Sequence, residues 1–134
     1  MGYMFNEGAS FNQPIGSWDV SNVKNMTSMF HCAFAFNQPI NTKMVERPDG
    51  TTYTAWNVSK VLTMESMFIG ASNFNQALDK WDVSKVTDMS NMFNCAYAFN
   101  QVLNNWNVSN VVKHKDMFID CYRDYITNPN FRKM

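Results

Sequence analysis

Few side chains in this sequence belong to the types that carry out catalysis or bind metal ions. The chain has two histidines and three cysteines: His31, His114, Cys32, Cys95 and Cys121. They do not stand at the spacings that are typical of a zinc site. The sequence shows no Ser-His-Asp order, no paired-carboxylate motif and no glycine-rich phosphate loop. We therefore expect no enzyme, no catalytic residue, no metal ion and no cofactor.

The charge balance narrows the classes of partner. Of the 134 residues, 11 are basic and 11 are acidic, so the formal net charge is zero. A nucleic-acid-binding protein would show a basic excess, so we expect no nucleic-acid partner. The apolar runs are only a few residues long, which predicts no membrane span. Residues 1–7 lack the basic and apolar regions of a signal peptide, and the composition leaves the localisation unknown.

A 25-residue repeat explains the pattern of apolar residues. The tryptophans lie at positions 18, 56, 81 and 106, so the last two intervals are 25 residues and the first is 38. Each tryptophan begins a similar phrase: Trp18-Asp19-Val20-Ser21-Asn22-Val23, Trp56-Asn57-Val58-Ser59-Lys60-Val61, Trp81-Asp82-Val83-Ser84-Lys85-Val86 and Trp106-Asn107-Val108-Ser109-Asn110-Val111. A Met-x-x-Met-Phe motif and a Phe-Asn-Gln motif recur at the same period. A repeat this short cannot bury its own apolar face, so neighbouring repeats must stack.

The spacing within each repeat predicts a short strand and then a short helix. Trp81 and Val83 alternate as in a strand with one buried face. The apolar residues of the next segment have the spacing of one helical face: Met89, Met92, Phe93 and Ala96. Good helix N-caps precede this segment in most rungs: Asn25, Thr63 and Asp88. The predicted fold class is a repeat solenoid of the α/β type, with a short strand plus a short helical turn in each 25-residue rung.

The additional residues of the first interval lie between Ile40 and Trp56. Here Pro48-Asp49-Gly50 stands between two β-prone runs, and Pro fixes φ while Gly allows a positive φ. The pattern predicts a protruding β-hairpin inserted at residues 41–55. Its candidate partner contacts are Arg47, Asp49 and Tyr53, although a hairpin without a binding role is about as well supported.

The whole chain is expected to form a single solenoid domain. Its parts are a partial first rung (1–17), a rung (18–40), the hairpin (41–55), two further rungs (56–80 and 81–105) and a terminal capping rung (106–134). The repeat decays after Phe118, where charged residues would give the cap a polar outer face: Arg123, Asp124, Arg132 and Lys133.

Two recurring polar positions have structural interpretations. The asparagines of the Phe-Asn-Gln motifs should lie above one another and bond the backbone of the adjacent rung, as a structural ladder of Asn12, Asn37, Asn75 and Asn100. A ligand-binding ladder is the less favoured alternative. Asn57 and Asn107 begin Asn-x-Ser sequons, but Asp occupies the same position in the other rungs, which indicates a turn acceptor. Cys32 and Cys95 are two rungs apart, beyond disulfide reach, so reduced thiols are expected. A bridge between Cys95 and Cys121, which are in neighbouring rungs but one position out of register, is the less favoured alternative.

Positions that vary between rungs are candidates for contact with a partner, because solenoids use stacked columns as binding faces. One column precedes the last valine of each tryptophan phrase: Asn22, Lys60, Lys85 and Asn110. The other column follows this valine: Lys24, Leu62, Thr87 and Val112. The alternative is that these residues are solvated positions without a binding role.

The phrase Phe-Asn-Gln-Pro-Ile-Gly-Ser-Trp-Asp-Val-Ser-Asn-Val at 11–23, followed by Met26-x-x-Met29-Phe30, closely resembles the repeats of BspA-like leucine-rich-repeat surface proteins. The resemblance covers residues 1–121. It implies a leucine-rich-repeat-like solenoid at the cell surface or secreted, with a role in adhesion or host interaction and no enzymatic activity. Similar arrays occur in giant viruses, so a place in a virion is also compatible with it.

The leading functional hypothesis is a non-enzymatic binding or adhesion module that presents its repeat face to a protein or glycan partner. The alternative is a structural component of a virion or surface layer. In that case the exposed rung ends would mediate self-association.

Overall fold

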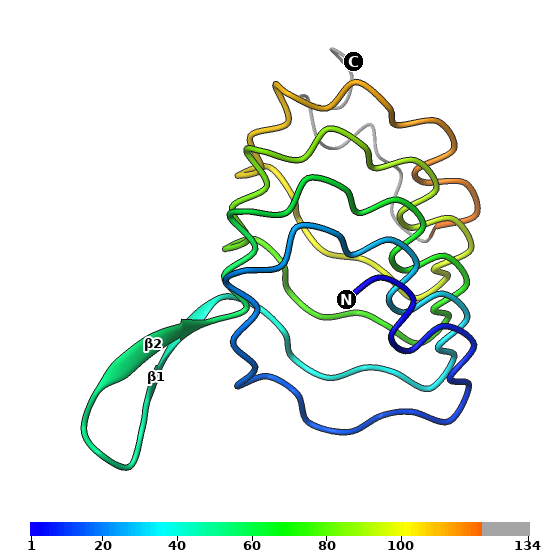
Figure 1. Cartoon of the computed structure of the whole chain (residues 1–134). Helices are drawn as coiled ribbons and strands as arrows, with labels where there is room; N and C mark the ends of the chain where they lie inside the picture. Colours follow the sequence, from blue (N-terminus) through cyan, green and yellow to red (C-terminus); the bar gives the residue numbers. More distant parts are fainter. Residues whose placement is uncertain (122–134) are drawn as a thin grey trace.

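The structure is a computed structural model that describes residues 1–121. The chain forms a stack of coils, and each 25-residue repeat makes one coil (Figure 1). Residues one repeat apart lie side by side in the stack, because backbone hydrogen bonds join each coil to the next. The hairpin projects from one side of the stack, between the coils that contain Trp18 and Trp56.

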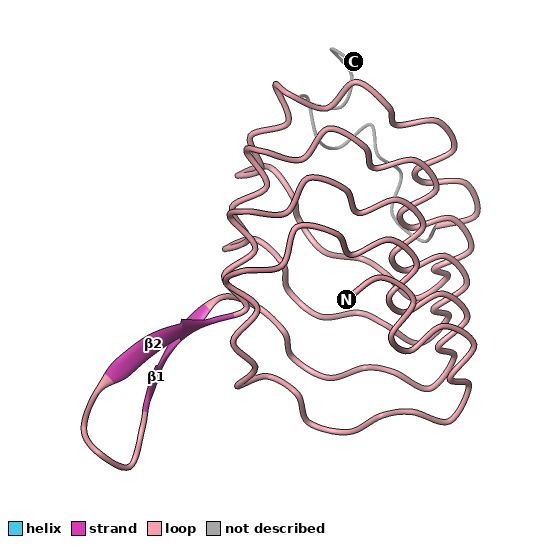
Figure 2. Cartoon of the chain, viewed as in Figure 1, coloured by secondary structure: helices cyan, strands magenta, loops and turns pink. Residues whose placement is uncertain are grey.

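The described residues contain no helix, and their only strands are the two of the hairpin (Figure 2). The predicted fold class, an α/β solenoid with a strand and a helical turn in each rung, is therefore wrong. The leucine-rich-repeat-like architecture implied by the resemblance is wrong for the same reason. The segment expected to be helical, 89–96, is instead a series of tight turns. In these turns the Met92 N–H donates to the Met89 carbonyl at 3.2 Å, and the Ala96 N–H donates to the Phe93 carbonyl at 3.0 Å.

Backbone dihedral angles explain why this segment is not helical. Asn91 and Cys95 have φ angles of 57° and 59°, in the left-handed region that a right-handed helix excludes. The two positions form left-handed columns through the described coils. One column is Tyr3, Ser28, Ser66, Asn91 and Asp116, and the other is Glu7, Cys32, Gly70, Cys95 and Asp120. Turns with a left-handed residue at every fourth position bury residues at the same spacing as a helix.

The hydrogen bonds of this segment also differ from those of a helix. Alternate N–H groups leave their own coil: those of Met89, Asn91, Phe93 and Cys95 donate to the carbonyls of Lys113, Lys115, Met117 and Ile119 at 2.8–2.9 Å. In a helix over 89–96, the Phe93 and Cys95 N–H groups would bond within the segment instead. Each coil therefore depends on its neighbour for half of the backbone hydrogen bonds in this segment.

The strand expected at Trp81–Val83 is absent, and the only parallel bridges between the described coils lie further along each repeat. Isolated parallel bridges join Asn25 to Thr63, Thr63 to Asp88, and Asp88 to Lys113. The expected helix caps at these positions form side-chain turns instead. The Oδ1 atoms of Asn25 and Asp88 accept the backbone N–H of the residue two positions on, at 2.8 and 2.9 Å.

Stacked aromatic rings form the core between the coils. Phe68 lies between Phe30 and Phe93, with ring centroids 5.4 and 5.6 Å away. A second phenylalanine stack, Phe36, Phe74 and Phe99, and a tryptophan stack, Trp56, Trp81 and Trp106, have the same arrangement. Each of these indoles donates its Nε1–H to a carbonyl of the preceding coil, at 2.8–2.9 Å. The buried tryptophans are therefore both packed and hydrogen-bonded.

The hairpin consists of β1 (Lys43–Glu46) and β2 (Thr52–Ala55). The strands pair antiparallel, from Lys43 opposite Ala55 to Glu46 opposite Thr52. At the base, Thr42 Oγ1 donates to the Trp56 carbonyl at 2.7 Å, and the Tyr53 hydroxyl donates to the Ser17 carbonyl. These contacts tie the hairpin to the neighbouring coils.

The charged residues expected in the cap (Arg123, Asp124, Arg132 and Lys133) lie outside the described residues. Within 1–121, no helix has the length and apolar character needed to cross a membrane.

Candidate partner-binding face

The two columns of varying residues lie side by side on one surface of the stack. All of their members are exposed: Asn22, Lys60, Lys85 and Asn110 in the first, and Lys24, Leu62, Thr87 and Val112 in the second. The valines between the columns point inward, and Val61 and Val86 are fully buried. Because neighbouring residues of an extended chain point to opposite sides, positions two apart share a surface. We call these eight residues the column face.

Backbone hydrogen bonds hold the second column at fixed spacing. The N–H of Leu62 donates to the carbonyl of Lys24 at 2.8 Å, and the Thr87 N–H donates to the Leu62 carbonyl at 2.9 Å. The Val112 N–H donates to the Thr87 carbonyl at 2.9 Å. Extended segments joined by such hydrogen bonds stand about 4.8 Å apart, so the column presents its side chains at a regular, preorganised interval.

The two columns differ in character. In the first, polar groups bond along the stack: Lys60 Nζ donates to Asn22 Oδ1 at 3.2 Å, and Asn110 Nδ2 donates to the Ser84 carbonyl at 2.7 Å. The second has large exposed apolar side chains, because Leu62 is 46% and Val112 is 76% exposed. The column face thus joins a polar row to a mixed row, in which Leu62 and Val112 are apolar and Lys24 and Thr87 are polar.

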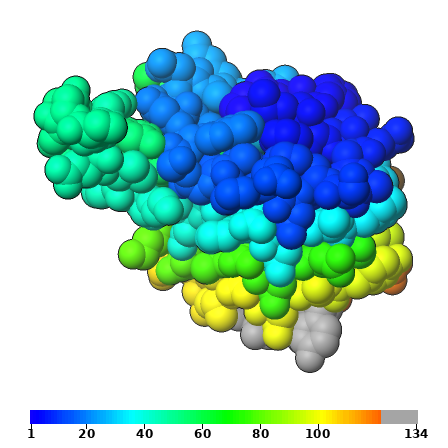
Figure 3. Space-filling model, turned by 90° about the horizontal axis from the view of Figure 1, so that it is seen from below, coloured from blue at the N-terminus to red at the C-terminus, as the bar shows by residue number. Residues whose placement is uncertain are grey.

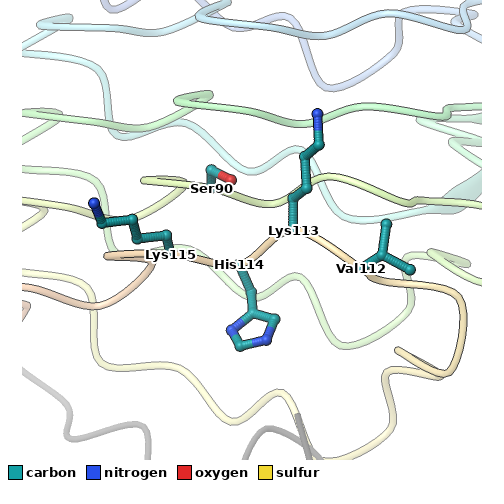
Figure 4. A pocket seen from close by; sticks show the side chains of 5 residues that line it. All are labelled: Ser90, Val112, Lys113, His114 and Lys115. Atoms are coloured by element: carbon teal, nitrogen blue, oxygen red, sulfur yellow. The ribbon is translucent and has the colours of Figure 1, made fainter.

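An open depression adjoins the column face at the coil of residues 106–121. Ser90, Val112, Lys113, His114 and Lys115 line it (Figure 4). Lys113 and Lys115 extend to the side of the chain on which Ser90 lies, whereas the partly buried His114 points the other way (Figure 4). Sequence reasoning did not identify this depression. The alternation of Lys113, His114 and Lys115 was the available signal, since it places both lysines on one side of an extended segment.

The candidate contacts of the hairpin interact mainly with the hairpin itself. The Arg47 guanidinium lies 4.3 Å from the centre of the Tyr53 ring, and Asp49 Oδ1 accepts the Thr51 N–H at 2.9 Å. Tyr53 contacts Ser17 at the base. The structure therefore brings Arg47 and Tyr53 together but does not join them to the column face.

The asparagine ladder links the coils through side chains. Asn12 Oδ1 accepts the Asn37 N–H at 2.9 Å, Asn37 Oδ1 accepts the Asn75 N–H at 3.0 Å, and Asn75 Oδ1 accepts the Asn100 N–H at 2.8 Å. The following glutamine adds bonds to the same asparagine, as Gln76 Nε2 does to Asn37 Oδ1 at 3.0 Å. These contacts hold one coil to the next.

The turn that follows each tryptophan uses Asp and Asn in the same way. Asp82 Oδ1 accepts the Ser84 N–H at 3.0 Å and its hydroxyl at 2.6 Å. These hydrogen bonds hold the pKa of the Asp82 carboxyl below its ordinary value. At the sequon positions, Asn57 and Asn107 accept the N–H of the serine two residues on, at 3.1 Å in both cases.

The cysteines do not form a reactive or metal-binding cluster within residues 1–121. All three are free thiols, and in those residues no three His, Cys, Asp or Glu side chains gather closely enough to hold a metal ion. Burial raises the pKa of the Cys32 thiol, and the nearby Glu7 and Cys95 raise it further. The Cys32 thiol is therefore mostly protonated at neutral pH and a poor nucleophile.

The family of the chain follows from a comparison of its repeats with family models. Residues 1–53 and 43–128 match the model described as "Mycoplasma protein of unknown function, DUF285". No curated protein and no solved structure matches the chain. Because the two matched segments together span most of the sequence, the chain belongs to the DUF285 family.

Proposed function

We propose that this protein is a non-enzymatic binding module whose column face contacts a protein or glycan partner. The observation that carries this proposal is the contrast between the column face and the interior. The tryptophan, valine, methionine and phenylalanine core positions recur from coil to coil. On a backbone of fixed spacing, one exposed column carries either Asn or Lys, and the other carries a different residue in each coil: Lys24, Leu62, Thr87 and Val112. Such a surface can vary its specificity without disturbing the fold.

The chemistry of the column face suits a partner that lies across several coils. The exposed side chains of Leu62 and Val112 offer apolar surface whose removal from water would stabilise a complex. The polar row offers lysine and asparagine donors that fix the orientation of the partner. The depression at Lys113 and Lys115 adds ammonium groups at one end of this surface.

The resemblance of the repeats to those of BspA-like surface proteins supports a role in adhesion or host interaction. It supports the class of function rather than a particular ligand. Members of such a class bind through extended surfaces, so the loss of one contact is expected to weaken binding and the loss of a row to abolish it.

The test is a comparison of two matched variants in binding to a glycan array and to immobilised extracellular-matrix proteins. The column variant carries Lys60→Ser, Lys85→Ser, Leu62→Ser and Val112→Ser. The control carries Lys43→Ser, Lys80→Ser, Tyr97→Ser and Val102→Ser, which remove the same number of lysines and of large exposed apolar residues elsewhere.

We expect the unmodified chain and the control to bind the same probe, and the column variant to lose that binding. Circular dichroism of all three proteins checks that the fold is retained. Equal binding by the column variant would contradict the proposed face. Absence of binding to every probe would contradict the adhesion class itself.

A further inference from the structure

The amino-terminal end of the stack exposes positions that are buried in every following coil. Met4 is 52% exposed, whereas Met29, its counterpart one coil on, is fully buried. Phe5, Phe11 and Trp18 are only partly buried, and their counterparts are fully buried: Phe30, Phe36 and Trp56. In Figure 3 this coil forms one end of the succession of coloured bands. Among residues 1–121, nothing covers this end of the stack, which is a layer of the core.

The backbone of this coil also has a row of unpaired acceptors. In the next coil the carbonyls of Thr27, Met29 and His31 accept N–H groups from the amino-terminal coil at 2.6–2.8 Å. The equivalent carbonyls of the amino-terminal coil are those of Gly2, Met4 and Asn6. None of these three accepts a backbone hydrogen bond from residues 1–121.

Three donors complete the pattern. Trp56 donates its indole N–H to the Ile15 carbonyl, Asn37 its backbone N–H to Asn12 Oδ1, and Gln38 its Nε2 to the Asn12 carbonyl. Their counterparts one coil earlier are Trp18 Nε1, the Asn12 N–H and Gln13 Nε2. Within the described part of the chain these three groups have no acceptor.

We propose that this end is a docking surface for a further coil of the same 25-residue repeat, a role independent of the column face. Only such a coil supplies a partner for every one of these acceptors and donors. Its alternate backbone N–H groups would donate to the carbonyls of Gly2, Met4 and Asn6. Its asparagine would accept the Asn12 N–H and Gln13 Nε2, and the carbonyl at the position equivalent to Ile15 would accept Trp18 Nε1. Its flat apolar side chains continue the stacks that end at Phe5, Phe11 and Trp18, so the docking continues the interface that joins the coils within the chain.

The docking has a direction. Two amino-terminal ends placed face to face would lack the row of backbone N–H groups that the carbonyls of Gly2, Met4 and Asn6 require, because both ends present carbonyls at these positions. The incoming coil must instead present its N–H side, so the contact is head-to-tail. A contact of this kind extends the stack rather than closing a symmetric dimer.

The experiment adds such a coil and uses Trp18 as the reporter. A copy of residues 64–88 is joined directly before Met1, because Asp88 precedes Met89 in the chain just as the copy would precede Met1. The copied segment carries Trp81→Phe, so that it adds no tryptophan. We expect acrylamide quenching of Trp18 to fall to the level of Trp56, Trp81 and Trp106. The thermal midpoint should rise by roughly 5 °C or more.

Two further measurements keep the outcome decisive. In a control fusion, the copies of Met67, Phe68 and Phe74 are replaced by serine, and Trp18 should remain as accessible as in the unmodified chain. In the intact fusion, hydrogen exchange of the Asn12 amide should slow, because the added asparagine accepts it. An accessible Trp18 in the intact fusion, or equal protection by the serine control, would overturn the proposal. A closed, symmetric dimer of the unmodified chain that protects Trp18 in both protomers would overturn its direction.

Discussion

The stack of coils and the hairpin satisfy their backbone in opposite ways. In the stack, alternate N–H groups cross to the next coil, so residues such as Phe93 and Met117 bond although they are far apart in sequence. In the hairpin, the pairs from Lys43–Ala55 to Glu46–Thr52 form between residues that a short turn connects. The stack is therefore built from non-local contacts and the hairpin from local ones.

The same difference appears in the burial of side chains. Met64, Met67, Phe68 and Ala71 are fully buried between neighbouring coils, whereas Met44 of β1 is 64% exposed. The coil repeats thus carry the stability of the fold, and the hairpin is an attachment to it. Stability measurements can test this division, beginning with the change of largest expected effect.

The substitution Phe68→Ala should cause the largest loss. Phe68 is fully buried and stacks against Phe30, Phe74 and Phe93, so its removal leaves a cavity that the rigid coils cannot close. We expect the free energy of unfolding to fall by about 3–5 kcal/mol in urea denaturation. The hairpin control Met44→Ala should change it by less than about 0.5 kcal/mol. Comparable losses of unfolding free energy in the two variants would contradict the view that the stack, and not the hairpin, carries the stability.

The substitutions Gly70→Ala and Gly50→Ala separate crowding in the stack from strain in the hairpin turn. Both glycines have a positive φ, 70° and 85°, which costs roughly 1–2 kcal/mol for alanine. A Cβ at Gly70 would also meet Cys32 Sγ at 3.2 Å, whereas one at Gly50 meets nothing within 4 Å.

We therefore expect the larger destabilisation for Gly70→Ala, measured by the shift of the thermal midpoint. In a Cys32→Ala background the sulfur is gone, and the cost of Gly70→Ala should approach that of Gly50→Ala. An undiminished cost would show that crowding by Cys32 is not its cause.

The substitution Asn37→Ala should weaken one junction of the stack. It removes the acceptor of the Asn75 N–H and of Gln76 Nε2, and both bonds are solvent-exposed. We expect a loss of roughly 1–2 kcal/mol in urea denaturation. The control Asn73→Ala changes an exposed asparagine that has no hydrogen bond among the described residues, and it should be neutral. A neutral Asn37→Ala would mean that water replaces the ladder without cost.

Excision of residues 43–55 should leave the stack nearly unchanged. It brings Trp56 to 25 residues from Trp18, the interval that the later coils have. The bond from Tyr53 to Ser17 is lost, but the connection between coils becomes shorter, so the free energy of unfolding should change by roughly 1 kcal/mol or less. Near-ultraviolet circular dichroism would report the aromatic stacks. Their loss on excision would show that the hairpin supports the core.

The substitution Asp82→Asn should have the smallest effect, confined to acid pH. Hydrogen bonds from Ser84 lower the pKa of Asp82 below 3.8, so its carboxylate stabilises the fold above that pH. This contribution is lost as the pH falls below 3.8 through the lower pKa of the folded state. Thermal midpoints between about pH 2 and pH 6 should therefore decline less steeply for Asp82→Asn.

The hairpin provides the control for this titration. The pKa of Asp49 is lowered in the same way by Thr51. If the hairpin is only an attachment, Asp49→Asn should leave the pH dependence of the stack unaltered. An equal flattening by both variants would argue that hairpin and stack unfold together.

The sequence is sufficient to place residues in the repeat, but it is not sufficient to decide the conformation of the backbone. A period of 25 residues puts Asn12, Asn37, Asn75 and Asn100 in one column whatever the local conformation. The spacing of Met89, Met92, Phe93 and Ala96, in contrast, is shared by a helix and by consecutive turns. The discriminating signal is the residue type at the fourth positions: Gly70 stands in one column with Cys32 and Cys95, and glycine is the residue that best accepts a positive φ.

The spacing of residues in the sequence likewise predicts some features of the column face and not others. Exposure of Leu62 and Val112 follows from their place beside buried valines. The depression does not, because its lining combines Ser90 with residues of the following coil, and the packing of the two coils is not contained in the spacing. The bond from Lys60 to Asn22 likewise requires the distance between coils.

The direction of the hydrogen bonds between coils has a mechanical consequence. Bonds such as that from Cys95 to Ile119 run from one coil to the next, along the axis of the stack. A pulling force applied along that axis would load these junctions in series. Each coil contacts only its neighbours, so the chain would peel apart one coil at a time rather than rupture in a single event. Such a stack behaves as an extensible tether that lengthens in steps of one repeat.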